Sequence, residues 1–297
     1  MRFLSVCSGI EAASVAWNPL GWKAVAFSEI EPFPCAVLAH HYPDTPNWGD
    51  MTKFQEWPDE PIDLLCGGTP CQSFSVAGLR KGLDDPRGNL MLTFGAIAAK
   101  YRPKWLVWEN VPGVLSSNAG QDFASFLGLL TGQVVKVPER GWSGGGIISG
   151  ITEAYGLSYR VLDAQYFGVP QRRRRVFVVG CLGDWRSAAA VLFEQESFKG
   201  DSSAGWSTRA VHPCLTAKGA RAFDDRTGYV LEEQGIRTTT PLEHERLMGF
   251  PDGYTLLPGK RSPDTPRFHA LGNSWCVPVV RWIGERIEQA NRILESR

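Results

Sequence analysis

The sequence predicts an α/β fold: a doubly wound, mostly parallel β-sheet with helices on both faces, accompanied by a small, irregular, β-rich region. Over the first 180 residues, short apolar runs alternate with helix-like stretches, which is typical of strands joined by crossover helices. From Gly183 to about Gly259 the sequence is polar and irregular. Between Val277 and Leu294 apolar residues return at helical spacing, which indicates an amphipathic helix.

Each element of the first region is read from a short segment. The expected strands are Phe3 to Cys7, Trp22 to Phe27, Ile62 to Cys66, Trp105 to Trp108, Tyr159 to Leu162 and Arg175 to Val179. The expected helices are Glu11 to Leu20, Pro32 to His40, Leu90 to Lys100 and Gln121 to Leu130. The glycine-rich segment Gly141 to Gly150 predicts a loop.

Composition narrows the class of protein. A chain of 297 residues with 43% hydrophobic residues allows one large domain, or a large and a small one. No apolar run approaches the roughly 20 residues of a membrane span, and the first residues lack the features of a signal peptide. Seven cysteines without a C-x-x-C pair predict neither a disulfide nor a structural metal. A cytoplasmic location and no membrane partner are therefore expected.

Charge is balanced overall but concentrated locally. The 31 basic and 31 acidic residues give a formal net charge of zero, which argues against tight, indiscriminate binding to nucleic acid. Arg172 to Arg175 nevertheless forms a run that leads into the apolar strand Val176 to Val179. Gln171, Arg173 and Arg175 alternate along that strand, so they should share one face. A solvated basic face or a targeting patch is the alternative reading of this run.

Cys71 stands out among the cysteines. It follows the strand ending at Cys66 and the turn Gly67-Gly68-Thr69, where open α/β sheets place their ligands. The stretch from Val76 to Asn89 has no clean period and reads as a mobile loop that could cover a substrate. This layout favours a thiolate nucleophile. Small buried hydrophobes are expected for the remaining cysteines that precede or follow apolar runs: Cys7, Cys35, Cys66, Cys181 and Cys276.

The first two strands end in residues suited to a nucleotide-like cofactor. Gly9 lies in the turn after the first strand, where a glycine lets the backbone approach a ligand. Glu29 follows the second strand, and an acidic residue there can bind the two hydroxyls of a ribose. Asp50 follows at the next turn. With one glycine in place of a full glycine-rich fingerprint, a plain strand-to-helix turn remains an equal alternative.

Five motifs occur in one order along the chain. GGTPCQSFSVAG is followed by KGLDDPRGNL, and then come Trp108-Glu109-Asn110-Val111, Gln171 to Arg175, Arg246 to Asp252 and Gly272-Asn273-Ser274. This series resembles the DNA (cytosine-5) methyltransferase family and spans almost the whole chain. The resemblance implies a Rossmann-like fold with a mixed, mostly parallel sheet. It also implies a catalytic domain at 1–182, a target-recognition domain at 183–262 and a segment at 263–297 that returns to the catalytic domain.

The resemblance also implies S-adenosylmethionine as cofactor. Cys7, Ser8, Gly9 and Ile10 would border its methionine part, Glu29 its ribose, and Ile30, Asp50 and Met51 its adenine. The pocket would be completed by Pro70, Leu90, Asn273 and Ser274. The chain departs from the family pattern at Cys7, Glu11 and Ile30.

The same resemblance assigns the chemistry. The Cys71 thiolate would attack carbon 6 of cytosine, Glu109 would contact N3 and the amino group, Arg175 would contact the base carbonyl, and Arg173 would order the site. Standing alone, a glutamate after a strand is more often a helix cap or a solvated group. The target base would be flipped out of the duplex while the loop after Cys71 closes, because its carbon atoms are inaccessible inside the stack.

DNA contacts are expected from two segments. In and near the loop after Cys71 they are Gln72, Ser75, Arg80, Lys81 and Arg87. In the short recognition segment Lys218, Arg221 and Arg226 are candidates for guanine contacts, with phosphate contact or solvent exposure equally open.

Several readings of the function remain open. The expected partner is double-stranded DNA, the expected state is a monomer, and a cognate restriction nuclease is an optional partner. An RNA cytosine methyltransferase and a catalytically silent nucleic-acid-binding protein are the alternatives within this fold. A dinucleotide-dependent oxidoreductase would leave Cys71 and its loop unexplained.

Overall fold

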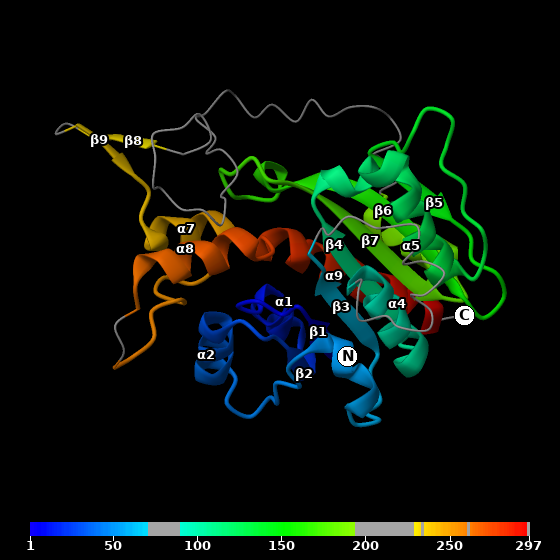
Figure 1. Cartoon of the computed structure of the whole chain (residues 1–297), viewed down its shortest axis with the longest axis horizontal. Helices are drawn as coiled ribbons and strands as arrows, with labels where there is room; N and C mark the ends of the chain where they lie inside the picture. Colours follow the sequence, from blue (N-terminus) through cyan, green and yellow to red (C-terminus); the bar gives the residue numbers. More distant parts are fainter. Residues whose placement is uncertain (71–89, 194–228, 233–234, 260–261, 296–297) are drawn as a thin grey trace.

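A seven-stranded sheet organises the chain. The computed structural model describes all residues except 71–89, 194–228, 233–234, 260–261 and 296–297. In spatial order the strands are β2 (Lys23–Ser28), β1 (Arg2–Val6), β3 (Leu64–Gly68), β4 (Trp105–Asn110), β7 (Arg174–Leu182), β6 (Tyr155–Asp163) and β5 (Gly145–Ile148) (Figure 1). Every strand that the sequence predicts is present, with ends that differ by a few residues.

The direction of β7 positions the site. Strands β1 to β4 pair in parallel, so their carboxyl ends meet at one edge of the sheet. Strand β7 pairs antiparallel with β4, with Phe177 opposite Glu109, so β7 begins at the edge where β4 ends. Strands β6 and β5 continue antiparallel. The mixed sheet confirms the predicted fold class, and the β4–β7 reversal brings the arginine run beside Glu109.

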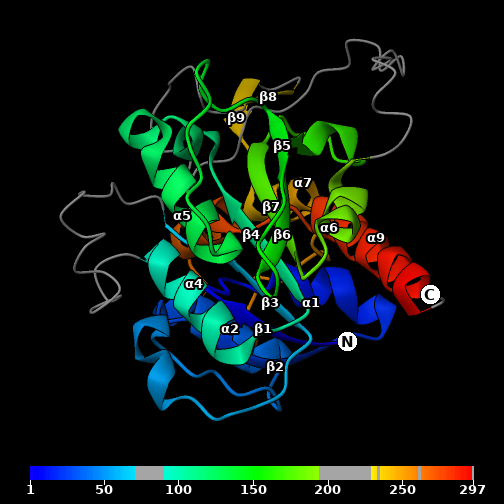
Figure 2. The same cartoon turned by 90° about the vertical axis from the view of Figure 1, so that its right-hand side faces the viewer.

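Helices cover both faces of the sheet (Figure 2). The described α-helices are α1 (Ala12–Trp17), α2 (Pro32–His41), α4 (Leu90–Tyr101), α5 (Gln121–Thr131), α6 (Trp185–Leu192), α7 (Pro241–Met248), α8 (Asp264–Asn273) and α9 (Val277–Glu295). The described 3-10 helices are η1 (Asn18–Leu20), η2 (Met51–Glu56), η4 (Pro112–Leu115), η5 (Ser117–Gly120) and η6 (Ala164–Tyr166).

Two apolar clusters sandwich the sheet. On β4, Trp105 and Val107 face the cluster that contains α1, α6 and α9, while Leu106 and Trp108 face the cluster that contains α4 and α5. Alternate residues of a strand point to opposite faces, so a strand buried on both sides must be apolar throughout. This explains the continuous apolar runs in the sequence.

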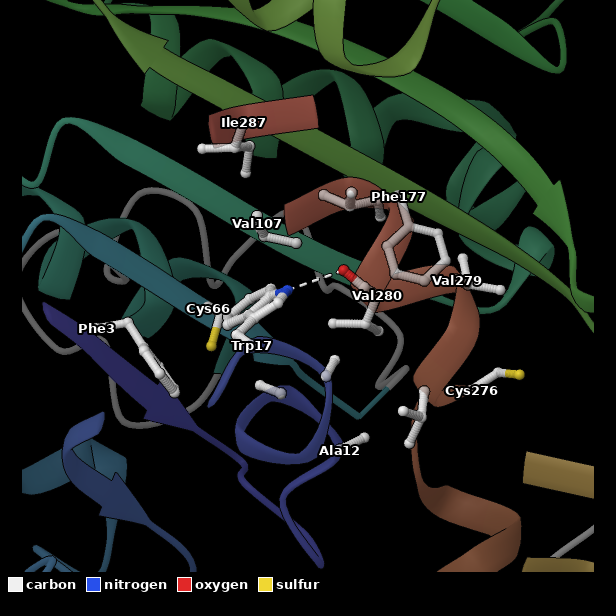
Figure 3. Packing of buried hydrophobic residues seen from close by; sticks show 14 of the residues in the cluster. Phe3, Ala12, Trp17, Cys66, Val107, Phe177, Cys276, Val279, Val280 and Ile287 are labelled. Carbon is white, nitrogen blue, oxygen red and sulfur yellow. Dashed lines mark hydrogen bonds between the residues drawn. The ribbon is translucent and has the colours of Figure 1, made fainter. Parts of the chain in front are cut away.

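The last helix closes the first cluster, as its predicted amphipathic pattern requires. Val280, Ile283 and Ile287 are fully buried against α1 and the sheet. The Trp17 Nε1–H donates to the Val280 carbonyl oxygen at 2.8 Å (Figure 3). Two more tryptophan indoles donate hydrogen bonds to residues further along α9.

Those two indoles anchor the C-terminal half of α9. Trp22 Nε1 donates to the Glu288 carboxylate at 3.1 Å, and Trp105 Nε1 donates to Asn291 Oδ1 at 2.9 Å. Buried indoles need an acceptor for their single N–H group, and α9 supplies one for each of the three. The helix is therefore an integral part of the core.

Some elements were not predicted. The glycine-rich segment expected to be a loop contains β5, which pairs with β6 and leaves its other side as a sheet edge. The segment expected to be irregular contains α6, whose apolar side packs on β6, β7 and α9. Helix α7 also lies there, with Thr240 and Glu243 forming a capping box.

The described part of the predicted recognition region is small. The hairpin of β8 (Tyr229–Glu232) and β9 (Gly235–Thr238) lies beside α7 at one end of the molecule (Figure 1), where a short β-like piece was expected. The division at residues 182 and 262 stays a prediction. Among the described residues, no helix is both long enough and apolar enough to cross a membrane.

Candidate active site

A cavity of about 690 Å³ opens at the edge of the sheet where β1 to β4 end. It brings together residues that lie far apart in the sequence. Of the predicted site residues, its wall includes Cys7, Gly9, Glu29, Ile30, Asp50, Met51, Pro70, Leu90, Glu109, Arg173, Arg175 and Asn273. Nine of the twelve residues expected to hold the cofactor thus share one cavity with the carboxyl group expected to act on the base.

Glu109 is held at the end of β4 by two donors. Arg175 Nε lies 3.0 Å from its Oε1, and Trp275 Nε1 donates to its Oε2 at 3.1 Å. The residue is 8% exposed. Burial raises the pKa of Glu109 above its ordinary value, while Arg175, Arg173 and the indole N–H partly oppose that rise. The side chain is therefore biased towards accepting a proton while it stays beside a cation.

Exposure alternates along the arginine run, which leads into β7 at Arg174. Gln171 and Arg173 are buried and Arg175 is half-buried, whereas Arg172 and Arg174 are exposed. The prediction that residues 171, 173 and 175 share a face is confirmed.

The two buried members of that face hold neighbouring segments. Arg173 Nη2 donates to the carbonyl oxygens of Gly272 and Ser274 at 2.9 and 2.7 Å. Gln171 Nε2 donates to the Leu247 carbonyl oxygen at 2.9 Å. These contacts join the start of β7 to the ends of α7 and α8.

The chain is fixed as it approaches Cys71. The Thr69 hydroxyl accepts from Trp108 Nε1 at 3.1 Å, and the Thr69 carbonyl oxygen accepts from Asn110 Nδ2 at 2.9 Å. Gly68 passes so close to the site that a Cβ there would lie 2.9 Å from Glu109 Oε2. β4 therefore holds the backbone that leads to Cys71 and carries Glu109 as well.

Several predicted residues lie outside the part of the chain that the structure describes. These are Cys71, Gln72, Ser75, Arg80, Lys81, Arg87, Lys218, Arg221 and Arg226. Their roles remain as the sequence predicts them.

The turn between β1 and α1 is tied to Glu29. The Glu29 Oε2 accepts from the Gly9 N–H at 2.7 Å, and Oε1 accepts from the N–H groups of Ile30 and Glu31 at 2.8 Å each. These bonds fix the carboxylate at the cavity wall. Its remaining lone pairs are available to hydroxyl donors.

The same turn has an unusual backbone. Cys7, Gly9 and Glu11 have φ values of 48°, 56° and 64°, in the left-handed region that favours glycine. Glu11 is fully buried and accepts from the Ser5 hydroxyl and from the Ser14 N–H and hydroxyl at 2.8, 3.0 and 3.0 Å. Burial raises the pKa of Glu11 to about 7. Left-handed backbone at non-glycine residues stores strain that the surrounding contacts must hold.

Three predicted cofactor residues differ from the rest in position. The Ile10 side chain is fully buried in the core, and its carbonyl oxygen accepts from the Tyr254 hydroxyl at 2.9 Å. Ser8 and Ser274 line a smaller cavity of about 30 Å³ that shares Cys7, Gly9 and Asn273 with the larger one.

The described cysteines are not thiolates. Cys66, Cys181 and Cys276 are buried as predicted, whereas Cys7 and Cys35 are only half-buried. Burial, with Glu29 and Asp50 nearby, raises the pKa of Cys7 to about 12. Although Cys7 lines the cavity, its thiol therefore stays protonated near neutral pH.

Two cavity residues escaped sequence reasoning. Trp275 follows Gly272-Asn273-Ser274 directly, and its place in that motif is the signal that could have marked it. His269 lines the cavity from α8, with its Nε2 3.4 Å from Asn273 Nδ2, and its spacing of four from Asn273 places both on one helix face. Apolar tryptophans and single histidines are common, so residue type alone did not point to either.

The donor and acceptor chemistry of the cavity fits S-adenosylmethionine. The cofactor presents ribose hydroxyls, an adenine amino group and a sulfonium cation. Carboxylates from Glu29, Glu31 and Asp50 line the cavity beside apolar Ile30 and Met51. Ile30 is 66% exposed, so a flat ring could cover it. No cluster of metal-ligating side chains occurs among the described residues.

Comparison with known proteins shows the family of the chain. The model of the C-5 cytosine-specific DNA methylase family matches residues 1–132, 150–212 and 191–289. A protein of Escherichia phage P1, named DNA N-6-adenine-methyltransferase, is 32% identical across 96% of this chain and 61% of its own length. The Type II methyltransferase M2.BsuMI of Bacillus subtilis (strain 168) is 27% identical across 97% of this chain and 76% of its own.

Solved structures show the same architecture. The Dnmt2 methyltransferase of S. pombe superposes with a TM-score of 0.66 at 19% identity, over 98% of this chain and 99% of the other. At that identity the likeness concerns the fold alone. The present chain spans less than two thirds of the phage P1 relative.

Proposed function

This chain belongs to the C-5 cytosine-specific DNA methylase family, and on that premise we propose that it methylates carbon 5 of a flipped cytosine in duplex DNA, with S-adenosylmethionine as methyl donor. One observation carries the proposal. The Glu109 carboxyl group, held by Arg175, faces the same cavity as Glu29 and Asp50. An acid for the base and acceptors for a nucleoside cofactor therefore lie within one site.

Covalent catalysis explains why the site needs a thiolate. Carbon 5 of cytosine is a poor nucleophile, and attack of Cys71 on carbon 6 makes it enamine-like. As that bond forms, Glu109 gives a proton to N3 and so neutralises the charge that develops on the ring. Carbon 5 then accepts a methyl group. A base removes the carbon-5 proton, the carbon–hydrogen electron pair restores the double bond, the thiolate leaves, and N3 returns its proton to Glu109.

The environment of Glu109 suits that proton transfer. Because burial raises its pKa, the carboxyl group can hold a proton closer to neutral pH than a solvated glutamate can. Arg175 lies 3.0 Å away and balances the negative charge that remains after the proton has left. Its guanidinium group would also meet the carbonyl oxygen of the base.

The cofactor would supply an electrophilic methyl group. Glu29 would accept from the ribose hydroxyls and Asp50 from the adenine amino group, with Ile30 and Met51 on the adenine faces. Gly9, Cys7 and Asn273 would border the methionine part. The small cavity beside Ser8 and Ser274 extends that end of the site.

A covalent trap tests the mechanism. Duplex DNA containing 5-fluorocytosine should form a stable protein adduct with the wild-type chain, because fluorine cannot leave as a proton does. Cys71→Ser should form none and should lose methyl transfer while it still folds and binds DNA. An active Cys71→Ser variant, or an active enzyme that forms no adduct, would refute the nucleophile.

The substrate itself needs a separate measurement. The name of the phage P1 relative raises methylation of adenine N6 as a second candidate, and RNA cytosine remains a third. Nucleoside mass spectrometry of DNA and tRNA after incubation distinguishes the three products. Bisulfite sequencing of DNA from expressing cells then gives the target sequence. 5-Methylcytosine in DNA is the expected product; N6-methyladenine without it would overturn the proposal.

The proposal extends to target recognition and to the state of the protein. Residues 183–262 would recognise the target sequence, and Lys218, Arg221 and Arg226 would reach the DNA. The protein would act as a cytoplasmic monomer, with or without a partner nuclease.

A further inference from the structure

Trp275 makes a polar contact with Glu109, although tryptophan is a largely apolar residue. Its indole Nε1–H donates to Glu109 Oε2 at 3.1 Å, across the sheet edge from the Arg175 contact with Oε1. The ring packs edge-on against Phe177 of β7, with centroids 6.1 Å apart and planes at 72°. Two donors on different segments thus hold the two oxygens of one carboxyl group.

The space for this contact is built into β3. At Gly68 a Cβ would lie 2.7 Å from Trp275 Nε1 and 2.9 Å from Glu109 Oε2. Any larger residue would push the two groups apart. The glycine, the indole and the carboxyl group therefore form one packed unit.

Trp275 also borders the predicted cofactor residues. It follows Asn273 and Ser274 in the chain, and all three line the small cavity beside Cys7 and Ser8. Arg173 holds the Ser274 carbonyl oxygen one residue before the indole. The backbone of Trp275 is therefore fixed from the arginine side.

We propose that Trp275 is a positioning residue for Glu109. The indole N–H of Trp275 orients the Glu109 carboxyl group for proton transfer to a nucleobase in the cavity. This inference rests on the proposed function, since Glu109 acts on a base only there. Both donors lie on fixed segments, Arg175 on β7 and Trp275 just before α9. The carboxyl plane is set before the base arrives, which is how positioned groups reduce the cost of reaching a transition state.

The charges around Glu109 define what the indole adds. Among the described residues, β7 and its lead-in face it with Arg175 and Arg173, β3 with uncharged Gly68, and the segment before α9 with uncharged Trp275. Losing a donor to the ionised carboxylate raises the pKa, since the charged form loses support. Trp275→Phe should therefore raise the apparent pKa of Glu109 by about one unit.

The test measures this directly in the protein without DNA. Infrared titration follows the carboxylic C=O band that disappears in Glu109→Gln. Trp275→Phe should shift its midpoint upward by about one unit. Trp142→Phe is the matched control, because Trp142 Nε1 also donates to an oxygen, the Gly120 carbonyl at 2.9 Å, away from the cavity. An unchanged or lowered midpoint in Trp275→Phe overturns the proposal.

Kinetics supply the second readout. In Trp275→Phe, kcat should fall about tenfold with the KM for S-adenosylmethionine within about twofold, and the Glu109 limb of the pH–rate profile should move upward. Should the phenylalanine variant fail to fold, 3-benzothienylalanine at position 275 keeps the ring shape and lacks the N–H. Wild-type kcat and pH profile in that variant would refute the inference.

The two proposals fail differently. An infrared shift in a protein that methylates no cytosine would leave the contact intact and remove the proposed function. Normal methylation with no change in Trp275→Phe would remove the positioning role and keep the function.

Discussion

Glu11 and Glu109 are two buried carboxyl groups with contrasting partners. Glu11 lies in the turn after β1 and takes hydrogen bonds from hydroxyls and a backbone N–H, and no arginine of the described ranges contributes to its pKa shift. Glu109 ends β4 beside Arg175 and Trp275. Neutral donors leave burial dominant and favour a protonated Glu11, whereas the cations around Glu109 keep its ionised form accessible. Burial alone thus does not set the charge state of a buried carboxyl group; the charge of its partners matters as well.

The largest expected effect is on catalysis by Glu109. Glu109→Gln keeps the shape and removes the transferable proton, so kcat should fall about 10³-fold, in the range of lost acid catalysis. Folding should persist, as measured by urea denaturation. Glu11→Gln should leave kcat within a few fold, and a comparable loss in both variants would contradict the contrast.

The next effect concerns pH and stability at Glu11. Its folded pKa of about 7 lies above the unfolded value of 4.5, so the native state binds more protons between these pH values. The free energy of unfolding should therefore fall as pH rises from about 4.5 to 7, by about 3 kcal/mol if the whole shift is realised. Urea titrations should show this slope in wild type and a flatter one in Glu11→Gln. Glu109→Gln should flatten it less.

Substitution of Arg173 tests whether the arginines near Glu109 also stabilise the fold. Arg173→Met leaves the carbonyl oxygens of Gly272 and Ser274 without this donor in a buried site, so the free energy of unfolding should fall by about 2 kcal/mol. Arg172→Met, at an exposed position, should change it by less than about 0.5 kcal/mol. Equal effects in the two variants would contradict the distinction between them.

The smallest effect probes the turn beside Glu11. Tyr254→Phe removes the hydroxyl that donates to the Ile10 carbonyl and should lower the free energy of unfolding by about 1 kcal/mol. The KM for S-adenosylmethionine should rise, because Cys7 and Gly9 in the same turn line the cavity. Tyr166→Phe, at a 67% exposed position, is the control and should change neither quantity. A wild-type KM in Tyr254→Phe would mean that the turn holds its shape without this bond.

The sequence predicted the elements whose pattern is local. The apolar strands, the amphipathic α9 and the alternation of residues 171, 173 and 175 follow from periodicity, and the structure confirms them. β5 was missed because glycines obscure strand periodicity, and its pairing with β6 overrides their weak preference. Helix α7 had a readable capping box at Thr240 and Glu243, which was overlooked.

Site residues that lie in sequence motifs could be predicted, whereas those whose role depends on tertiary packing could not. The sequence placed Glu29, Asp50 and Glu109 at strand ends, and the structure brings them to one cavity. Glu11 departs from the family pattern in the sequence, but its buried partners depend on how β1 and α1 meet. Trp275 carries no signal of a polar role, because its donor matters only after Gly68 and Glu109 are folded beside it.

The hydrogen bond between Trp17 and Val280 can form only late in translation. Its partners are 263 residues apart, so the ribosome releases Trp17 long before α9 exists. At roughly 5–20 residues per second, the delay is on the order of tens of seconds. Until α9 is made, the indoles of Trp17 and Trp22, and later that of Trp105, lack their acceptors on this helix, and one face of the sheet is uncovered. We therefore expect the core between α1, the sheet and α9 to close only after α9 has been synthesised.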